Sequence, residues 1–378
     1  MLLTLWGLFG VLVSFGQMPA TPKTKPILRM QDFIGVNLLE GDPIQYANCA
    51  GFAREYHEWP YDEGNHLDIQ KVPMAPVPQR YPNNRYAWNT SRWQSDKQFD
   101  NWYVDLRNRL DESANSPLPV CATLKSCLPF ITFDKTGSTS WSVGGLSEVK
   151  PNEGILANSV LPESYRWYAD WVYQFTKKHG SSNTNIGTFK AALGEPNTTA
   201  DIGRNAVGYI ELWNEENKYW KTPFSLYQFT GEEYGAMTSA AFYGKNKNGT
   251  DLNADAGSAL PVPSTQSYRV GMRNADPNMR LVLGGTAGIR DFDANFITSI
   301  RTWYTNNPSV GAFPYDVINF HHYNSIKWDG IALGQANTTA KSPEADEWTI
   351  GTTLTKFKQR LKTIRTDLNM PNQELWLS

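Results

Sequence analysis

Short apolar runs recur along this chain of 378 residues, and they alternate with stretches of helical periodicity. Each run is four to eight residues long and ends in polar or aromatic residues. Continuous apolar runs of this length are typical of parallel strands buried on both faces. We count seven in order, at 33–38, 51–54, 118–124, 207–213, 280–285, 316–323 and 374–377.

Five intervening stretches carry helix signals. Apolar residues repeat at helical spacing over 99–110, 165–175, 292–303 and 354–368. Thr230 and Glu233 have the spacing of a capping box, which opens a helix. Basic residues before Gly180 suit the negative end of a helix, and we expect that glycine to form a left-handed cap.

Strands that alternate with helices form β-α units and a parallel sheet. The fold class we predict is α/β, a (β/α)8 TIM barrel with about seven of its eight strands present. Residues 373–378 look like a strand that stops where it should reach the top of the barrel, so we expect a barrel that is incomplete at its C-terminus. We expect one domain over 27–378, in which the Pro- and aromatic-rich stretch 55–96 is a long loop at the barrel mouth.

The first 20 residues carry no charge, and 2–13 are almost wholly apolar. This run is shorter than the roughly 20 residues that span a bilayer, and small residues follow it. We expect a signal peptide over 1–20 and a secreted or periplasmic protein, with a buried first strand as the alternative. No other segment is apolar enough to predict a membrane span.

A formal net charge of -2 gives no electrostatic reason to expect nucleic acid or an anionic membrane as a partner. Aromatic residues make up 13% of the chain, which fits either an aromatic core or side chains that stack on sugar rings. Three cysteines show no metal-ligand spacing, so we predict no metal site. Cys121 and Cys127 form either a small disulfide loop or two buried thiols. No nucleotide- or phosphate-binding motif predicts a cofactor.

The sharpest chemical signal is the run 209–217, in which a strand leads into a polar cluster. Asn214 and Glu215 then lie at the carboxyl end of the fourth strand, where barrel enzymes carry their catalytic groups. A carboxylic acid at this end can protonate a glycosidic oxygen and later deprotonate water, provided that its pKa is raised. Trp213 and Trp220 are candidates to raise that pKa by desolvation. The alternative is that residues 214–217 cap the next helix.

The sequence Trp213-Asn214-Glu215 resembles the acid/base motif of the clan A glycoside hydrolases, such as families 5 and 39, except that Glu216 stands where Pro often follows. The resemblance extends from about 33 to 378. It implies a retaining enzyme that cleaves β-linked oligo- or polysaccharide by double displacement, without a cofactor. Glu215 would be the general acid/base, and Asn214 would bind the sugar.

Other strands carry weaker parts of the same resemblance. Asn37 ends a run like the clan's first strand, and Arg54 ends one like the second, where an arginine commonly holds the nucleophile ionised. The run 317–323 looks like the sixth strand, with His321 and Tyr323 facing inward and His322 as the alternative. The clan's nucleophile, a glutamate, is expected just after Ser378, so we expect the 378-residue chain to be inactive.

We expect His57, Glu58 and Trp59 to follow the second strand and enter the cleft, either as sugar-binding residues or as loop structure. His57 and Trp59 join the other predicted carbohydrate-binding residues, which are Asn37, Arg54, Trp213, Asn214, Trp220, His321, His322 and Tyr323. Two other functions compete with hydrolysis by a retaining enzyme. One is a non-catalytic carbohydrate-binding protein on an inactive barrel. The other is a metal-dependent hydrolase on the same fold, which the lack of clustered ligands disfavours.

Overall fold

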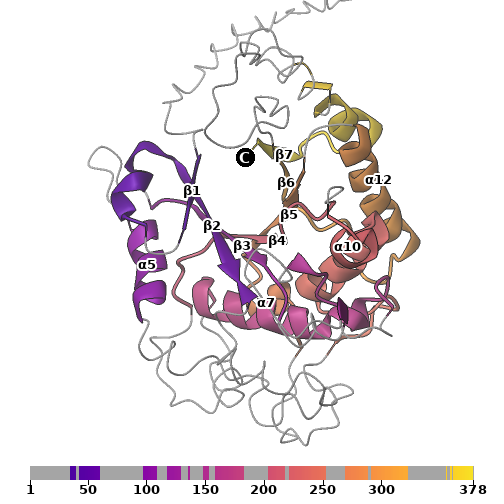
Figure 1. Ribbon diagram of the computed structural model, residues 1–378, viewed down its shortest axis with the longest axis horizontal. Helices are drawn as coiled ribbons and strands as arrows, with labels where there is room; N and C mark the ends of the chain where they lie inside the picture. The colour runs from indigo at the N-terminus through magenta and orange to yellow at the C-terminus, as the bar shows by residue number, and fades with distance from the viewer. Residues whose placement is uncertain are drawn as a thin grey trace, which may run out of the picture.

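The computed structural model describes seven strands that form one parallel sheet in chain order. The strands are β1 (Gly35–Leu38), β2 (Phe52–Glu58), β3 (Val120–Lys125), β4 (Tyr209–Leu212), β5 (Arg280–Thr286), β6 (Val317–Phe320) and β7 (Glu374–Leu377). The sheet curls into a half-barrel, with β1 and β7 at its edges (Figure 1). The described residues are 35–39, 42–59, 97–108, 117–128, 135–136, 148–152, 158–182, 203–217, 221–252, 269–287, 291–321, 355, 358–359 and 361–377.

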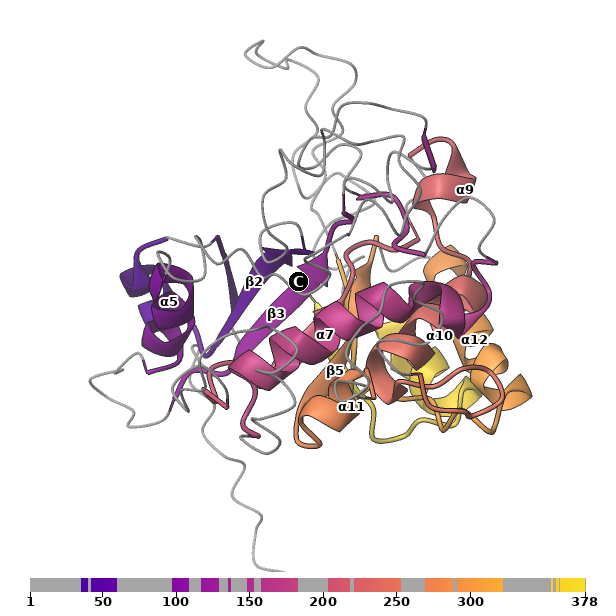
Figure 2. The same cartoon turned by 90° about the horizontal axis from the view of Figure 1, so that it is seen from below.

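Helices cover the convex side of this sheet, outside the curve of the strands (Figures 1 and 2). The α-helices are α5 (Lys97–Arg107), α7 (Arg166–His179), α9 (Phe224–Tyr227), α10 (Gly231–Thr238), α11 (Met272–Ala275) and α12 (Asp291–Asn306). Shorter turns are the 3-10 helices η2 (Ile44–Cys49) and η4 (Pro162–Tyr165) and the π-helical turns η6 (Ser239–Tyr243) and η7 (Thr363–Asp367). Within the described residues, no helix has the length and apolar character needed to cross a membrane.

The two faces of the sheet bury different residues, because successive side chains of a strand point to opposite faces. On the convex side, strand residues such as Ala122, Ile210 and Leu283 share one large apolar cluster with the helices. On the concave side, a smaller cluster of Cys121, Val282 and Val317 lies near the beginnings of the strands. The rings of Phe52, Tyr209 and Trp376 pack against it.

The sequence predicted the strand order and the α/β class, and the structure confirms a parallel sheet with helices along it. The capping box is also confirmed, since Thr230 accepts from the Glu233 backbone while Glu233 bonds back to Thr230. The predicted helix 354–368 lies partly outside the described residues and includes the π-helical turn η7. The predicted signal peptide 1–20 lies wholly outside them.

Two local predictions were wrong. The second strand does not end at Arg54 but continues to Glu58, because the charged residues that follow Arg54 find partners on both faces of the sheet. The cap after α7 is not left-handed, since Gly180 has φ -73° and ψ -177°. Glycine is needed there for space, because an added Cβ would lie 2.6 Å from the Thr176 carbonyl oxygen and 2.7 Å from Asp276 Oδ2.

Candidate active site

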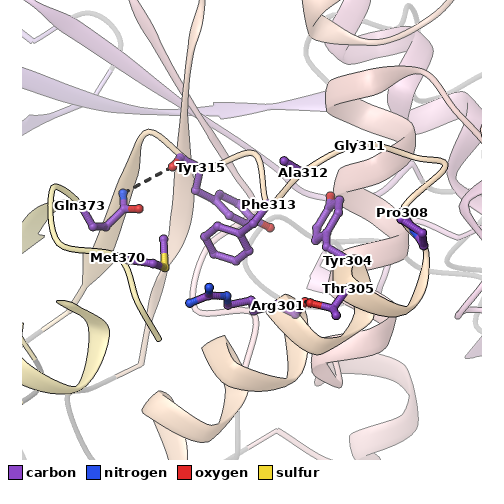
Figure 3. A pocket seen from close by; sticks show the side chains of 10 residues that line it. All are labelled: Arg301, Tyr304, Thr305, Pro308, Gly311, Ala312, Phe313, Tyr315, Met370 and Gln373. Carbon is purple, nitrogen blue, oxygen red and sulfur yellow. Dashed lines mark hydrogen bonds between the residues drawn. The ribbon is translucent and has the colours of Figure 1, made fainter. Parts of the chain in front are cut away.

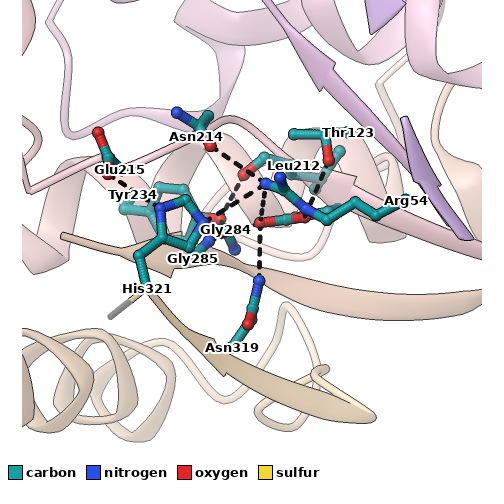
Figure 4. A network of polar contacts seen from close by, with 11 residues as sticks. Arg54, Thr123, Leu212, Asn214, Glu215, Tyr234, Gly284, Gly285, Asn319 and His321 are labelled. Atoms are coloured by element: carbon teal, nitrogen blue, oxygen red, sulfur yellow. Dashed lines mark hydrogen bonds and ion pairs between the residues drawn. The ribbon is translucent and has the colours of Figure 1, made fainter. Parts of the chain in front are cut away.

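A fully buried carboxylate, that of Glu211 on β4, is the centre of a polar network on the concave face. Figure 4 shows this network, with Arg54, Asn319 and His321 among its labelled residues. Arg54 on β2 donates hydrogen bonds to both oxygens of the Glu211 carboxylate. Nε of Arg54 donates to Oε2 at 2.5 Å, and Nη2 donates to Oε1 at 3.0 Å. Two parallel bonds of this kind fix the relative orientation of the two side chains.

Three further donors converge on Glu211 from other strands. Thr123 on β3 donates to Oε2 at 2.9 Å, while the Gly285 backbone N–H on β5 and the Asn319 amide on β6 donate to Oε1 at 2.6 and 3.3 Å. Burial opposes the charged form of Glu211, but Arg54 outweighs it and holds the pKa of the carboxyl below its usual value. Burial likewise opposes the charge on Arg54, yet the Glu211 carboxylate raises the pKa of the guanidinium. The pair therefore stays charged, and its hydrogen bonds link the five strands β2, β3, β4, β5 and β6.

Arg54 also reaches toward the carboxyl end of β4. Its Nη2 donates to Oδ1 of Asn214 at 3.1 Å and lies 3.5 Å from Nε2 of His321. Nδ1 of His321 lies 2.9 Å from Oε1 of Glu215, at hydrogen-bond distance. Because a guanidinium can only donate, this arrangement fits a His321 ring whose Nε2 faces Arg54 and whose Nδ1–H donates to Glu215. The His321 side chain is 2% exposed and that of Glu215 is 12% exposed, so the network opens at Glu215.

The backbone at the end of β4 is held in an uncommon conformation. Trp213 and Glu215 have positive φ angles of 72° and 49°, in the left-handed region that non-glycine residues rarely adopt. Their backbone N–H groups donate to the Leu124 and Gly285 carbonyl oxygens at 2.8 and 3.0 Å, which fixes the two residues between β3 and β5. Gly285 also leaves room for His321, since a Cβ there would lie 2.0 Å from Nε2. Residues held in such sparsely populated backbone conformations cluster at functional sites.

Four of the predicted site residues are thus brought together, namely Arg54, Asn214, Glu215 and His321. Asn37 lies beside them, because β1 pairs with β2 in a register that places Asn37 against Arg54. Asn37 is exposed, so a ligand has access to it.

Three other predicted residues lie on the opposite side of the sheet. His57 is within β2, not after it, and its ring packs between strand and helices near Trp171 and Phe175. Trp59 is 1% exposed and stacks on Trp171, with 5.5 Å between ring centroids. Trp213 is also 1% exposed and packs against core aromatic rings. The expectation that His57 and Trp59 enter the cleft is therefore wrong, and Trp213, which was expected to desolvate Glu215, also lies in the core.

Trp220, His322 and Tyr323 lie outside the described residues. Sequence reasoning missed Glu211, Thr123 and Asn319 as parts of the network. Glu211 was detectable, because a carboxylate inside an otherwise apolar strand must find a partner when the strand is buried.

Cys121 and Cys127 are free and buried, which favours the thiol alternative over a disulfide. Burial raises the pKa of the Cys121 thiol, and Glu211 adds to that shift. Among the described residues, no group of three His, Cys, Asp or Glu side chains is arranged to hold a metal ion.

A cavity of about 540 Å³ lies at the other end of the strands (Figure 3). It is lined by the end of α12, the loop before β6 and the loop before β7, including Arg301, Tyr304, Phe313 and Met370. The cavity is thus separated by the length of the strands from Glu215. Glu215 and the groups bonded to it lie at the carboxyl ends of the strands, where parallel sheets carry their functional sites, so the network and not the cavity is the candidate active site.

The network offers the groups that acid/base chemistry needs. Glu215 is a partly exposed carboxyl whose position is fixed by His321, and Asn214 is an amide held by Arg54. Together they can exchange a proton with a ligand and hydrogen-bond its hydroxyl groups. No known family model matches this chain, and no curated protein matches it in sequence.

Proposed function

We propose that this protein is a secreted glycoside hydrolase that cleaves β-linked oligo- or polysaccharide with retention of configuration, on a (β/α)8 barrel. The observation that carries the proposal is the Glu215–His321 contact of 2.9 Å at the carboxyl end of β4. This is the end at which parallel barrels carry their catalytic groups. The resemblance of Trp213-Asn214-Glu215 to the clan A acid/base motif supports the same function.

In the first step of the proposed reaction, Glu215 gives a proton to the glycosidic oxygen while a carboxylate attacks the anomeric carbon. His321 occupies Oε1 of Glu215, so the transferred proton belongs on Oε2. In the second step, Glu215 takes a proton from water, and the water oxygen displaces the enzyme carboxylate. Asn214, held by Arg54, hydrogen-bonds a hydroxyl of the sugar in both steps.

The proposed reaction needs a second carboxylate, which attacks the anomeric carbon while Glu215 donates its proton. Glu211 is unsuited to this role, because it is fully buried and accepts five hydrogen bonds. The register pairs Phe320 on β6 with Leu377 on β7, so the end of β7 lies beside His321. A retaining mechanism requires a second carboxylate about 5 to 5.5 Å from Glu215, and we propose that it acts at this edge of the sheet.

A carbohydrate-binding protein without hydrolytic activity is the second candidate. The observation in its favour is that Glu211, the other carboxylate of the network, is committed to Arg54. The two functions share a sugar site and differ in whether a nucleophile acts beside it.

The test is to determine the coding sequence beyond Ser378 and to assay the extended protein on β-1,4- and β-1,3-linked glucans, xylan and mannan. We expect hydrolysis with retention, seen by NMR of the first product, and a loss of at least about 100-fold in kcat/KM for Glu215→Gln. Glu232→Gln is the matched control, because Glu232 is an exposed glutamate at the start of α10. Near-full activity of Glu215→Gln would refute the acid/base assignment, and binding without hydrolysis would favour the second candidate.

A further inference from the structure

An ion pair ends the two strands next to the candidate active site. Glu58 is the last residue of β2 and Lys125 is the last residue of β3, and the register places them directly opposite each other. Both share the concave face with Arg54 and Thr123, because residues two or four positions apart on a strand point the same way. The pair therefore lies at the same end of the sheet as Glu215.

This pair is incompletely hydrogen-bonded. Nζ of Lys125 lies 3.5 Å from Oε1 of Glu58, which is longer than a normal hydrogen bond. Glu58 is 6% exposed, and its Oε2 is buried and accepts no hydrogen bond from the described residues. Buried carboxylate oxygens nearly always have a donor, so this one calls for a donor from a ligand or from water.

The pair is also continuous with the network around Glu211. The Tyr56 ring lies between two cations, with Arg54 Cζ at 4.5 Å and Lys125 Nζ at 4.6 Å from its centroid. Cations on an aromatic face are attracted by its electron density, so Tyr56 connects the two ion pairs. Strand spacing separates β2 from β4 by about 10 Å. A ligand chain that reaches Glu215 therefore also reaches Glu58 and Lys125 through a neighbouring unit.

We propose that Glu58 and Lys125 form a sugar subsite that binds adjacent hydroxyl groups of a neutral sugar unit next to the bond that is cleaved. This inference rests on the proposed function for its place in the reaction, although binding alone is enough to test it. One hydroxyl donates to Oε2 of Glu58, and a neighbouring hydroxyl oxygen accepts from Nζ of Lys125.

The charges of the site select the class of ligand. A hydroxyl is both a donor and an acceptor, so a pair of hydroxyls satisfies Glu58 and Lys125 together. The carboxylate of a uronic acid, or a phosphate group, has no proton to give to Glu58 at neutral pH, and its negative charge would be repelled by the Glu58 carboxylate. The cations Arg54 and Lys125 already have anionic partners, Glu211 and Glu58. The subsite is therefore suited to a neutral sugar rather than an acidic one.

The test is calorimetric titration of the 378-residue chain with neutral tetrasaccharides: β-1,4-linked glucose, xylose, mannose and galactose, and β-1,3-linked glucose. The β-1,4-mannuronate tetramer serves as the acidic counterpart of mannotetraose. For the neutral sugar that binds best, we expect Glu58→Gln to raise Kd about 10- to 100-fold and Lys125→Met to raise it about 10-fold. A deoxy analogue that lacks the contacted hydroxyl should lose little further affinity in Glu58→Gln, because both changes remove one interaction.

Glu374→Gln is the matched control, since Glu374 forms an ion pair with Arg280 at the opposite end of the sheet. Its Kd should equal that of the wild type, and thermal unfolding checks that all variants are folded. The inference is overturned if no neutral tetrasaccharide binds, if Glu58→Gln and Lys125→Met bind like the wild type, or if the mannuronate tetramer binds more tightly than mannotetraose. Product analysis of the extended protein reports hydrolysis separately. Binding that depends on Glu58 without any hydrolysis would support the subsite and refute the proposed hydrolase. Hydrolysis that neither Glu58→Gln nor Lys125→Met changes would support the hydrolase and refute the subsite.

Discussion

The two sides of β2 bury ionisable residues in contrasting ways. On the concave side, Arg54 belongs to a network that ends at Glu215, a carboxyl that is still 12% exposed. On the convex side, Glu55 and His57 meet the Tyr103 hydroxyl beneath α5 and α7. Both groups are buried and polar, yet only the first ends at a partly exposed carboxyl, whereas Glu55 and His57 are 0% and 3% exposed. Burial of charge alone therefore does not mark a functional site, and the exposure of a carboxyl to ligands distinguishes the two groups.

On the helix side, aromatic rings pack against the convex cluster of Glu55, His57 and Tyr103. The His57 ring lies 4.8 Å from Phe175 and 6.2 Å from Trp171, and Tyr103 lies 4.9 Å from His179, measured between centroids. This arrangement leaves the cluster a structural role, which is to satisfy polar groups between sheet and helices. The concave network, by contrast, holds residues that a ligand can touch. Three changes test this division of roles.

The largest effect is expected from Glu211→Gln. It leaves the buried Arg54 without its carboxylate, and breaking a buried ion pair in this way costs about 3 to 5 kcal/mol of unfolding free energy. Urea unfolding of the purified chain measures the loss. The double change Arg54→Met with Glu211→Leu should be less destabilising than Glu211→Gln alone, because it leaves no unpaired charge. Glu374→Gln breaks an exposed pair and should cost less than about 1 kcal/mol. A small loss for Glu211→Gln would mean that the network is not the structural centre of the sheet.

The sequence was a good guide to the strands and a poor guide to which side their residues face. Apolar runs located all seven strands in order, because burial on both faces requires them. The same rule ended β2 too early, since Glu55 and His57 have the polarity of a loop. Their partners, such as Tyr103, come from elements distant in the chain, and no local pattern reveals them.

The candidate site was predicted in outline for a similar reason. Glu215 and His321 follow strand ends, which local patterns locate. Trp213 precedes Glu215 and was expected beside it, but its positive φ turns it into the core. Glu211 was hidden inside an apolar run, and only the arrangement of β2, β3, β5 and β6 around it shows its role.

A smaller effect is expected from Tyr103→Phe on the convex side. The change removes the hydroxyl that donates to Oε2 of Glu55 and faces Nδ1 of His57, which leaves buried polar atoms short of a partner. We expect a loss of about 1 to 3 kcal/mol in urea unfolding. Sugar binding should be unchanged, because Tyr103 lies on the other side of β2 from Glu58. A variant with normal stability but weaker sugar binding would contradict the separation of the two sides.

The smallest effect is a pH dependence that arises from His179 on the convex side. Burial lowers the pKa of His179 well below its usual value, and the nearby Lys178, His57 and Arg204 add to the shift. His179 is therefore neutral in the fold but takes up a proton when unfolded below about pH 6.5. The unfolded state then binds more protons, so stability falls with decreasing pH, by up to about 1.4 kcal/mol per pH unit. Above pH 6.5 this contribution is fully present.

The measurement is urea unfolding at pH 7.5, 6.5 and 5.5, for the wild type and His179→Phe. As the pH falls from 7.5 to 5.5, the unfolding free energy of the wild type should decrease more than that of His179→Phe. Glu211 titrates in another window, because its lowered pKa means that its contribution is lost only below about pH 4.3. A Glu211→Gln difference that stays constant between pH 7.5 and 5.5, beside a His179→Phe difference that does not, would assign acid sensitivity above pH 5 to the helix side. Equal pH dependence in both variants would show that the two clusters titrate as one.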